Sequence, residues 1–409
     1  MVRFEVDGIL LKEKIKKVIY GEEGLLFLLA HPLVEGNKVF LFSGSEGEKL
    51  SVCPIDVFWK EGGEKNSVLG LYFDRKTIKT LVSLLRKGRF YFSAEEGNES
   101  VGFSISSGGE FNVFLKGVIK AEDDMFFSPE FFLKGEGEEI FSISGKDVDK
   151  FEFGLLRCLS LITGKCIDNP AYENVCLRVE SGRGEVVATN GYSLYKKEFN
   201  CEAKRDVFFL WGRKTARAVW ESLAKVKRKS FFSVKKKESF FVVEVGDIKI
   251  FVREGNFDFP DYSTLLKDLL SRERWDGQIS LEGSEFKTWC MRLSLVAGKE
   301  TKVIPLQIRL EGREGLMKEF ILKVWNEMTG DTAVERFFVE GEPWIKEAKG
   351  FIEGVYDYRK LRSFLSTLKK GEWFELYYAK SSSNRVYPLI LKNKREVYLL
   401  MPLSTDENK

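Results

Sequence analysis

Residues 141–148, FSISGKDV, decide the fold, because the same pattern occurs twice more: FEVDGILL at 4–11 and ISLEGSEF at 279–286. In each stretch an alternating apolar and polar run, typical of a β-strand, ends in a polar residue and a glycine. A helical pattern follows the glycine. Successive copies of this glycine lie 137 and 138 residues apart, at Gly8, Gly145 and Gly283. The period indicates an internal repeat that divides the 409 residues into three parts.

A second helix repeats in the same three parts. It begins at Asp74-Arg75-Lys76, Gly212-Arg213-Lys214 and Tyr358-Arg359-Lys360. Apolar spacing predicts one buried face on each helix, formed by Ile78, Leu81, Val82 and Leu85; by Ala216, Val219, Trp220 and Leu223; and by Leu361, Phe364, Leu365 and Leu368. Basic turns and hairpin-like strands follow each of these helices. We therefore expect an α+β fold of three tandem units, 1–135, 138–270 and 276–405, with linkers near 131–140 and 267–278.

The composition excludes several classes of protein. With 44% hydrophobic and 31% charged residues, the chain can bury sizeable cores and is not disordered as a whole. Lysine and arginine (65) nearly balance aspartate and glutamate (62), so any charge for nucleic acid must be concentrated in one place. The one histidine, His31, precedes Pro32 in an apolar run, where we expect a turn role. Histidine-dependent hydrolases and histidine metal sites do not fit this sequence.

The cysteines and the N-terminus indicate the compartment. Six cysteines without a CxxC pair suit neither a disulfide framework nor a zinc site, and Cys158 and Cys290 lie in apolar helical patterns typical of a core. The N-terminal MVRFEVDGILLKEKIKK lacks the apolar region of a signal peptide. No apolar run approaches the ~18 residues that span a membrane. We expect a soluble, cytoplasmic protein.

Positive charge recurs at one position of all three units. An Arg-Lys pair opens each second helix, although the helix dipole disfavours cations there. For any single residue, a solvated helix face is an ordinary explanation. The threefold repetition favours contact with backbone phosphates of a nucleic acid, which gives sequence-independent, salt-dependent binding. The candidates are the pairs themselves, Arg75, Lys76, Arg213, Lys214, Arg359 and Lys360, and the first helices add Lys14, Lys17, Arg157, Lys287 and Arg292.

Three motifs resemble one family. VATNGYSLYKKEF (187–199) resembles the VATDGHRLA segment of the bacterial DNA polymerase III beta subunit, the sliding clamp. FPDYSTLL (259–266) is similar to that family's FPDYRRVLP, and YPLILKNKREVYLLMPLST (387–405) resembles its final strand ending in MPMR. The motifs occur in the family's order and cover roughly residues 140–405, whereas the first unit matches by helix and strand pattern alone.

The resemblance implies a subunit of three clamp domains, each with two βαβββ halves. Two subunits would close head to tail into a ring around duplex DNA, with helices inside and sheets outside. Such a clamp is a processivity factor in DNA replication: a clamp loader places it on DNA, and it tethers the replicative polymerase. It is not an enzyme, and it needs no cofactor or metal.

The resemblance also implies a hydrophobic cleft that binds short peptides of partner proteins. Matched motif by motif, the cleft comprises Tyr172, Thr189, Gly191, Tyr192, Ser193, Leu194, Pro260, Leu265, Pro388, Leu399, Leu400, Met401, Pro402 and Leu403. For the leucines, and for Leu399 above all, an ordinary core position is an alternative. The family's His-Arg is Tyr192-Ser193 here and an arginine is Thr264, so we expect an altered peptide preference. The loop 164–173, where some clamps touch DNA, keeps Lys165, and residues 405–409 extend past the family's usual end.

Two other functions are weighed against a replicative clamp. An enzyme is disfavoured because Gly212-Arg213-Lys214-Thr215 lacks the upstream glycine of a phosphate-binding loop, and Gly44-Ser45-Glu46-Gly47 is not a nucleophile elbow. A clamp-like paralogue or scaffold for repair or other partners is the stronger alternative. The altered cleft and the weakly matching first unit are its support.

Overall fold

A computed structural model describes residues 2–18, 25–30, 38–45, 49–61, 69–85, 87–95, 101–106, 112–120, 131–132, 135, 137–162, 169–225, 231–253, 258–271, 274–275, 277–293, 295, 304–312, 317–326, 328–343, 353–378 and 388–403. Within these residues, the order strand, helix and three strands occurs six times, twice in each third of the chain. His31, Lys165 and residues 405–409 lie outside the described part, so nothing further is concluded about them.

The elements fall into three successive units. The N-terminal unit contains β1 (Val2–Asp7), α1 (Gly8–Val18), β2 (Leu25–Ala30), β3 (Lys38–Ser45), β4 (Lys49–Asp56), β5 (Phe58–Glu61), β6 (Leu69–Phe73), α2 (Arg75–Leu84), β7 (Arg89–Glu95), β8 (Val101–Ser106) and β9 (Asn112–Lys120). The middle unit contains β10 (Glu138–Ser144), α4 (Lys146–Leu161), the 3-10 helix η2 (Pro170–Glu173), β11 (Asn174–Glu180), β12 (Arg183–Thr189), β13 (Ser193–Asn200), β14 (Glu202–Ala203), β15 (Val207–Gly212), α5 (Arg213–Lys225), β16 (Phe231–Lys237), β17 (Phe240–Val245) and β18 (Ile248–Arg253).

Helix α6 (Tyr262–Leu269) leads to the C-terminal unit. That unit contains β19 (Gly277–Glu282), α7 (Gly283–Leu293), β20 (Pro305–Gly312), β21 (Met317–Trp325), β22 (Thr332–Pro343), β23 (Glu353–Asp357), α8 (Tyr358–Leu365), β24 (Trp373–Tyr378), β25 (Leu389–Lys392) and β26 (Glu396–Leu400). The predicted linkers were partly wrong, because 138–140 belong to β10 and 267–269 to the last turn of α6.

The six repeated helices begin where the sequence predicts, whereas α6 was not predicted, and side chains explain several of the starts. The Asp7, Asp74 and Asp357 carboxylates accept backbone N–H bonds from the first turns of α1, α2 and α8, at 2.7–3.0 Å. At the start of α4, Gly145 instead adopts a φ of +57°, which favours glycine. These caps satisfy donors that a helix cannot satisfy itself.

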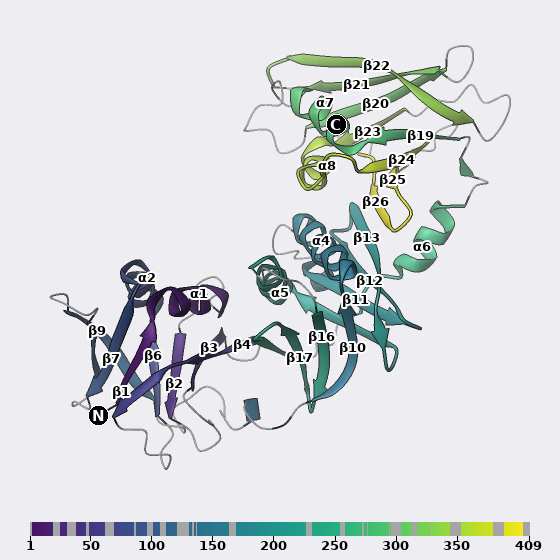
Figure 1. The fold of residues 1–409 in the computed structure, drawn as a ribbon. Coiled ribbons are helices and arrows are strands. Elements are labelled where there is room, and N and C mark those ends of the chain that lie inside the picture. The colour runs from purple at the N-terminus through teal and green to yellow at the C-terminus, as the bar shows by residue number, and fades with distance from the viewer. Residues whose placement is uncertain are drawn as a thin grey trace.

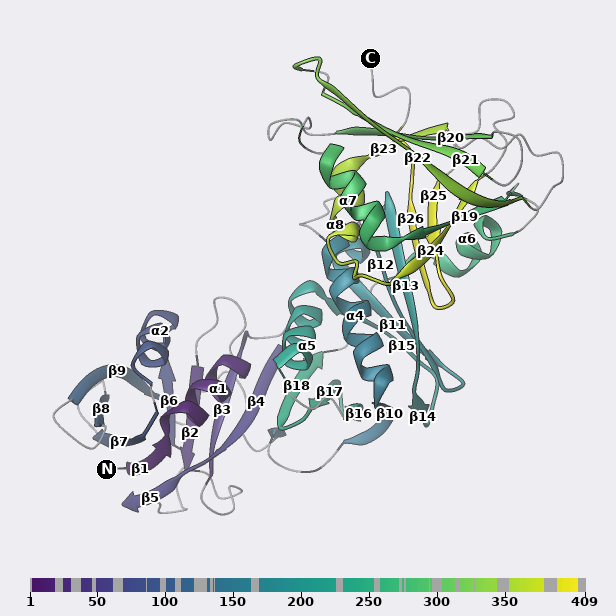
Figure 2. The ribbon, with the colours of Figure 1, turned by 45° about the horizontal axis from the view of Figure 1, so that its top comes forward.

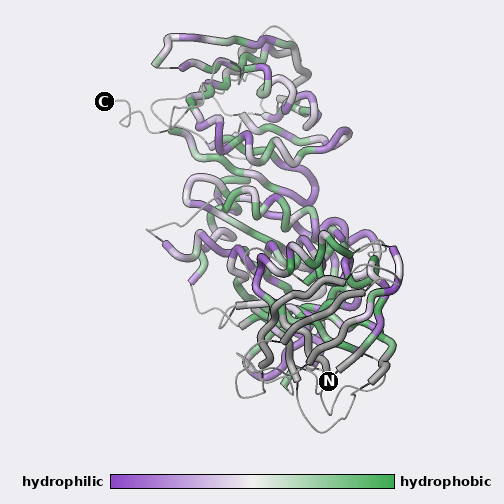
Figure 3. Tube along the Cα trace, turned by 90° about the vertical axis from the view of Figure 1, so that its left-hand side faces the viewer, coloured by the Kyte–Doolittle hydropathy of each residue, from purple (hydrophilic) through white to green (hydrophobic). Residues whose placement is uncertain are grey.

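The predicted helix faces are confirmed. All twelve predicted apolar positions of α2, α5 and α8 and the residues that follow them are buried, except Val82 and Trp220, which are partly buried and pack against the same core. Cys158 and Cys290 are also buried, as predicted. Figure 3 shows hydrophobic and hydrophilic segments alternating along the trace, as expected when each element buries one face.

Among the described residues the strands form two long sheets that cross the boundaries between units. In the first, of fourteen strands, β18 of the middle unit pairs antiparallel with β4 of the N-terminal unit. In the second, of twelve strands, β13 of the middle unit pairs antiparallel with β26 of the C-terminal unit. Each pairing lets an edge strand find a partner in the neighbouring unit.

The three units follow one another along a curve. Figures 1 and 2 both show α2, α1, α5, α4, α8 and α7 along the inner side of this curve, with the sheets on the outer side. Along this row α1 packs against α5, α5 against α4, and α4 against α8. Helix α6 is the exception, because it lies on the outer side beside the joint of the middle and C-terminal units (Figure 1). No helix in the described part of the chain has both the length and the apolar character needed to span a membrane.

Candidate functional site

The predicted peptide-binding residues gather where β13 meets β26. Thr189 lies opposite Leu194, and Leu194 lies opposite Leu399, so these three side chains share one face of the sheet. Leu194 and Leu399 are buried in a cluster with Tyr262 and Leu266 of α6. This face is therefore the outer one, which α6 covers.

A tight loop joins β12 to β13 and continues the site. The Asn190 side-chain oxygen accepts backbone N–H bonds from Tyr192 (3.0 Å) and Ser193 (2.7 Å). The Thr189 hydroxyl donates to the Ser193 carbonyl at 2.9 Å. The Met401 backbone N–H then donates to the Tyr192 carbonyl at 2.7 Å, so the loop and the end of β26 are held together.

Gly191 and Tyr172 meet in this loop. Gly191 has a φ of +84°, and a Cβ placed there would lie 3.1 Å from the Tyr172 ring. The backbone conformation therefore favours glycine, and the close ring leaves little room for a Cβ. The contact brings the predicted Tyr172 of η2 to the predicted Gly191.

The exposed part of the site is apolar. Tyr192 is 55% exposed, Leu265 42% and Met401 40%. With the buried Leu194 and Leu399 in the same region, these residues define what we call the peptide surface. Pro260, Pro402 and Leu403 are half-buried at its margin, Pro388 is buried, and the Leu403 N–H donates to the Val355 carbonyl at 2.8 Å.

Ser193 and Leu400 correct the predicted set. They lie directly opposite each other, and Leu400 belongs to the main core on the helix side of the sheet. Because successive side chains of a strand point to opposite faces, these two residues cannot face a ligand on the outer side. They support the site from beneath.

The predicted DNA contacts divide into exposed and occupied residues. At the starts of α2 and α5, Lys76, Arg213 and Lys214 are exposed, whereas Arg75 and Arg359 are half-buried. Arg292 is 64% exposed on its side chain and lies 3.7 Å from Glu335. The Lys287 ammonium donates to the Ser366 carbonyl at 3.1 Å. The helix row therefore does present cations on the inner side of the curve.

Arg157 is not among these cations, and its prediction as a DNA contact was wrong. The residue is completely buried, and its guanidinium donates to Glu396 and Glu372 at 2.6 Å each. Both carboxylates belong to the C-terminal unit, whereas Arg157 lies on α4. A guanidinium held inside this joint cannot reach DNA phosphates.

The Glu396 carboxylate is the centre of a buried network. Besides Arg157, it accepts hydrogen bonds from Tyr195 (2.8 Å), Lys197 (2.6 Å) and the Asn393 amide (2.7 Å). Burial by itself would raise the pKa of Glu396, but the charges of Arg157 and Lys197 outweigh burial and hold the pKa below its usual value. The carboxylate is therefore ionised at neutral pH.

Lys14, Lys17 and Lys360 also have partners at joints. The Lys14 ammonium contacts the Asp247 carboxylate, which lies 3.8 Å from Lys17, so α1 is tied to the turn between β17 and β18. The Lys360 ammonium lies 3.3 Å from the centroid of the Tyr192 ring, a cation–π contact between the C-terminal and middle units. Of the two lysines paired with Asp247, the Lys14 side chain is the more buried (14% exposed, against 22% for Lys17), and we no longer assign Lys14 to DNA.

The sequence analysis missed the rest of the Arg157 network, in which Glu372 and Glu396 pair with Arg157, and Tyr195 and Lys197 donate to Glu396. Their positions, up to 239 residues away in the chain, carry no local pattern. One sequence feature could have indicated a second contact surface on α4: Phe153 and Leu156 are apolar but lie outside the main buried face of the helix. In the described residues, no group of histidine, cysteine and carboxylate side chains is placed to hold a metal ion.

Comparisons with known proteins identify solved structures that share this fold. No family model matches the chain, and no curated protein matches it by sequence. Solved structures match it over its whole length. A DNA polymerase III beta subunit of Thermotoga maritima is 16% identical with a TM-score of 0.74, covering 99% of this chain and 100% of that one. A DNA polymerase sliding clamp of Bacillus subtilis is 16% identical with a TM-score of 0.74, covering 99% of each chain.

A third structure, of a Pseudomonas aeruginosa sliding clamp bound to griselimycin, is 16% identical with a TM-score of 0.73, covering 98% of this chain and 99% of that one. At these identities the likeness establishes the fold. The chain therefore has the fold of the bacterial sliding clamps, as its motifs predicted.

The Arg157 network leads to a stability prediction. Arg157→Met leaves Glu372 and Glu396 at a buried joint without their guanidinium, and should lower the free energy of unfolding by about 3–5 kcal/mol. The matched control is Arg292→Met, which removes an exposed ion pair and should cost less than about 1 kcal/mol. Denaturant unfolding of the full chain measures both, and equal small losses would contradict the prediction.

The same network predicts a dependence on pH. Because the folded-state pKa of Glu396 is lowered, its contribution to stability is present above the unfolded-state pKa of about 4.3 and is lost as the pH falls through the lower folded value. Glu396→Gln should therefore flatten the fall of the thermal midpoint below about pH 4.3. A variant with an unchanged acid profile would show that Glu396 does not control it.

Proposed function

We propose that this protein is a DNA sliding clamp. Two copies close head to tail into a ring around duplex DNA, and the ring tethers the replicative DNA polymerase. The observation that carries the proposal is the way the units are joined. The fold is that of solved sliding clamps, and the joints within the chain supply a rule for a further joint between chains.

Both joints use equivalent strands. At each joint the last strand of one unit, β18 or β26, pairs with the strand that ends the first βαβββ half of the preceding unit, β4 or β13. The equivalent strands at the two ends of the chain are β9 and β22. Among the described residues, β8 is the only strand that pairs with Asn112–Gly117 of β9, and β21 is the only strand that pairs with Thr332–Glu340 of β22. Within this described part of the chain, each stretch therefore has one side open. Pairing β9 of one copy with β22 of the other repeats the same joint.

Apolar side chains near β22 support this contact. Val334 is 47% exposed, and Met291 at the end of α7 is 53% exposed. The ion pair of Arg292 and Glu335 holds these two elements beside each other. Exposed apolar residues beside an open sheet edge suit an interface between subunits.

The same rule supports the predicted division into three domains, 1–135, 138–270 and 276–405. Each domain contributes two βαβββ halves, and two chains supply six domains to the ring. The inner side of the curve holds the exposed cations Lys76, Arg213 and Lys214, which we assign to phosphate contact. Their scatter over separate helices suits a ring that slides rather than one that binds a fixed sequence.

The outer surface supplies the tether. We assign the peptide surface, with Tyr192, Leu265 and Met401 exposed, to short segments of the polymerase, the clamp loader and other partners. An apolar surface over buried leucines can accept apolar anchors of a peptide. The role requires no catalytic step and no cofactor, and places the protein in the cytoplasm.

Sizing by light scattering tests the ring. We expect about 94 kDa, twice the 47.1 kDa of one chain. Met291→Asp with Val334→Asp should shift the mass to that of one chain, because two carboxylates would be buried in the interface. Phe208→Asp, at a residue 50% exposed in the middle unit, is the matched control and should leave the dimer intact. A monomer in the unmodified protein would rule out the ring.

Primed circular DNA tests the tether. With the cognate polymerase and loader, the protein should lengthen the product of each binding event. Changing Lys76, Arg213 and Lys214 together to glutamate should weaken retention on DNA, and should lower the slope of log retention against log salt by about 0.9 for each phosphate that is no longer neutralised. The same change at Lys204, Arg205 and Lys394, exposed in turns away from the helix row, should have little effect. An unchanged salt slope in the first variant would reject the assignment of these cations to phosphate contact. If the unmodified protein did not stimulate the polymerase, the sliding-clamp function itself would be rejected.

Titration with the clamp-binding peptide of the cognate polymerase tests the peptide surface. Met401→Glu with Leu403→Glu should abolish binding, because carboxylates would meet the apolar anchors. The thermal midpoint should change little, since neither side chain is fully buried. Undiminished affinity in the folded variant would place the peptide elsewhere.

A further inference from the structure

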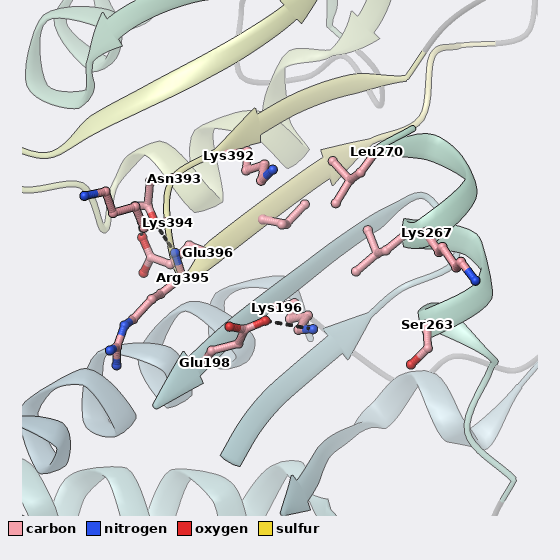
Figure 4. Close-up of a pocket in the computed structure, with 12 residues that line it drawn as sticks. Lys196, Glu198, Ser263, Lys267, Leu270, Lys392, Asn393, Lys394, Arg395 and Glu396 are labelled. Atoms are coloured by element: carbon pink, nitrogen blue, oxygen red, sulfur yellow. Dashed lines mark hydrogen bonds and ion pairs between the residues drawn. The ribbon is translucent and has the colours of Figure 1, made fainter. Parts of the chain in front are cut away.

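A hollow of about 290 Å³ lies on the outer side of the chain, on the flank of α6 away from the peptide surface. Its walls come from three elements: α6, β13 and the turn between β25 and β26 (Figure 4). On α6 the lining residues Ser263, Lys267 and Leu270 fall on one flank, and Leu265 falls on the other. The helix therefore separates the hollow from the peptide surface. We call this hollow the α6 pocket.

The floor of the α6 pocket is apolar. Leu266 and Val397 are buried in the cluster beneath α6, and Leu270 packs against that cluster. The floor is rigid because β26 is paired with β13 on one side and with β25 on the other. Such a floor can receive one apolar side chain without rearrangement.

The charges around the pocket are unequal. Both lining carboxylates are occupied, Glu396 by Arg157 and Lys197, and Glu198 by Lys196 at 3.1 Å. Lys267 is exposed on α6, and Lys392 donates to the Tyr377 hydroxyl at 3.0 Å. Among the described residues neither Lys267 nor Lys392 has a carboxylate partner. The pocket therefore offers an apolar floor beside two ammonium groups that make no ion pair with the described residues.

The pocket suits carboxylates better than phosphate. In the turn between β25 and β26, the Asn393 N–H donates to the Glu396 carbonyl and the Arg395 N–H to the Asn393 side chain. These backbone donors are satisfied, so the turn provides no cradle for a phosphate. In Figure 4 the Arg395 guanidinium points away from α6, and it lies 3.5 Å from Asp147. Separate lysines remain, which match separate carboxylates along a chain.

We propose that the α6 pocket binds an acidic segment of a partner protein, with an apolar side chain on the floor and flanking aspartate or glutamate residues beside Lys267 and Lys392. This site goes beyond the tether, because it lies across α6 from the peptide surface and needs no DNA. A partner that carries both a segment for the peptide surface and an acidic segment for the α6 pocket would bind on both flanks of α6 at once.

The test uses the full chain and a fluorescein-labelled peptide, Glu-Asp-Leu-Asp-Glu, with Gln-Asn-Leu-Asn-Gln as the neutral analogue. Anisotropy should report saturable binding of the acidic peptide below about 1 mM, and much weaker binding of the neutral one. The double substitution Lys267→Gln and Lys392→Gln should lower the affinity for the acidic peptide about tenfold, since two ion pairs are lost. A higher salt concentration should also lower this affinity, because salt screens the attraction between lysines and carboxylates.

Lys394→Gln is the matched control, because the Lys394 ammonium points away from α6 in Figure 4, and binding should stay within about twofold. Met401→Glu should also leave binding unchanged. Equal binding of the two peptides, or unchanged binding by a folded Lys267 and Lys392 variant, would overturn the proposal. Displacement of the peptide by inorganic phosphate at equal concentration would identify a general anion site instead. None of these outcomes depends on the processivity assay, so the two proposals fail separately.

Discussion

A strand at the edge of a sheet must find a partner, and the way this chain meets that requirement governs the rest of its structure. β18 finds β4, and β13 finds β26, so two sheets run through the boundaries between units. Because equivalent strands are used each time, successive units are added with the same sense of rotation, and the chain curves. The helices then fall on the inner side and the sheets on the outer side, which separates the face that we propose for DNA from the face that we propose for partner proteins.

The two joints are reinforced differently. Between the N-terminal and middle units, Lys14 and Lys17 meet Asp247 near the surface. Between the middle and C-terminal units, Arg157 is enclosed with two carboxylates and a tyrosine that bonds one of them. A buried ion pair contributes little net stability by itself, but losing one member is costly, so it penalises any other arrangement of the joint. This rigid joint also carries α6, and thereby both outer surfaces.

Much of the fold and part of the site could be predicted. The repeated glycines and the apolar spacing located the helices, and the motif resemblance located the loop at 189–193 and the end of β26. The predictions failed where exposure depends on a neighbouring unit. On sequence pattern Arg157 resembles Arg213, since both are cations on amphipathic helices, yet the first is buried and the second exposed. Likewise Leu399 and Leu400 are adjacent, and strand pleating sends them to opposite sides.

The sequence by itself determined the local elements and their threefold order, because helix and strand periodicity, caps and turns depend on residues close together in the chain. Tertiary structure alone decided which cations remain exposed, which leucines reach the outer face, and where α6 leaves a pocket. These outcomes depend on contacts between residues as much as 239 positions apart. The burial of a side chain depends on every element packed around it. A local sequence pattern shows only which face of its own helix or strand the side chain lies on.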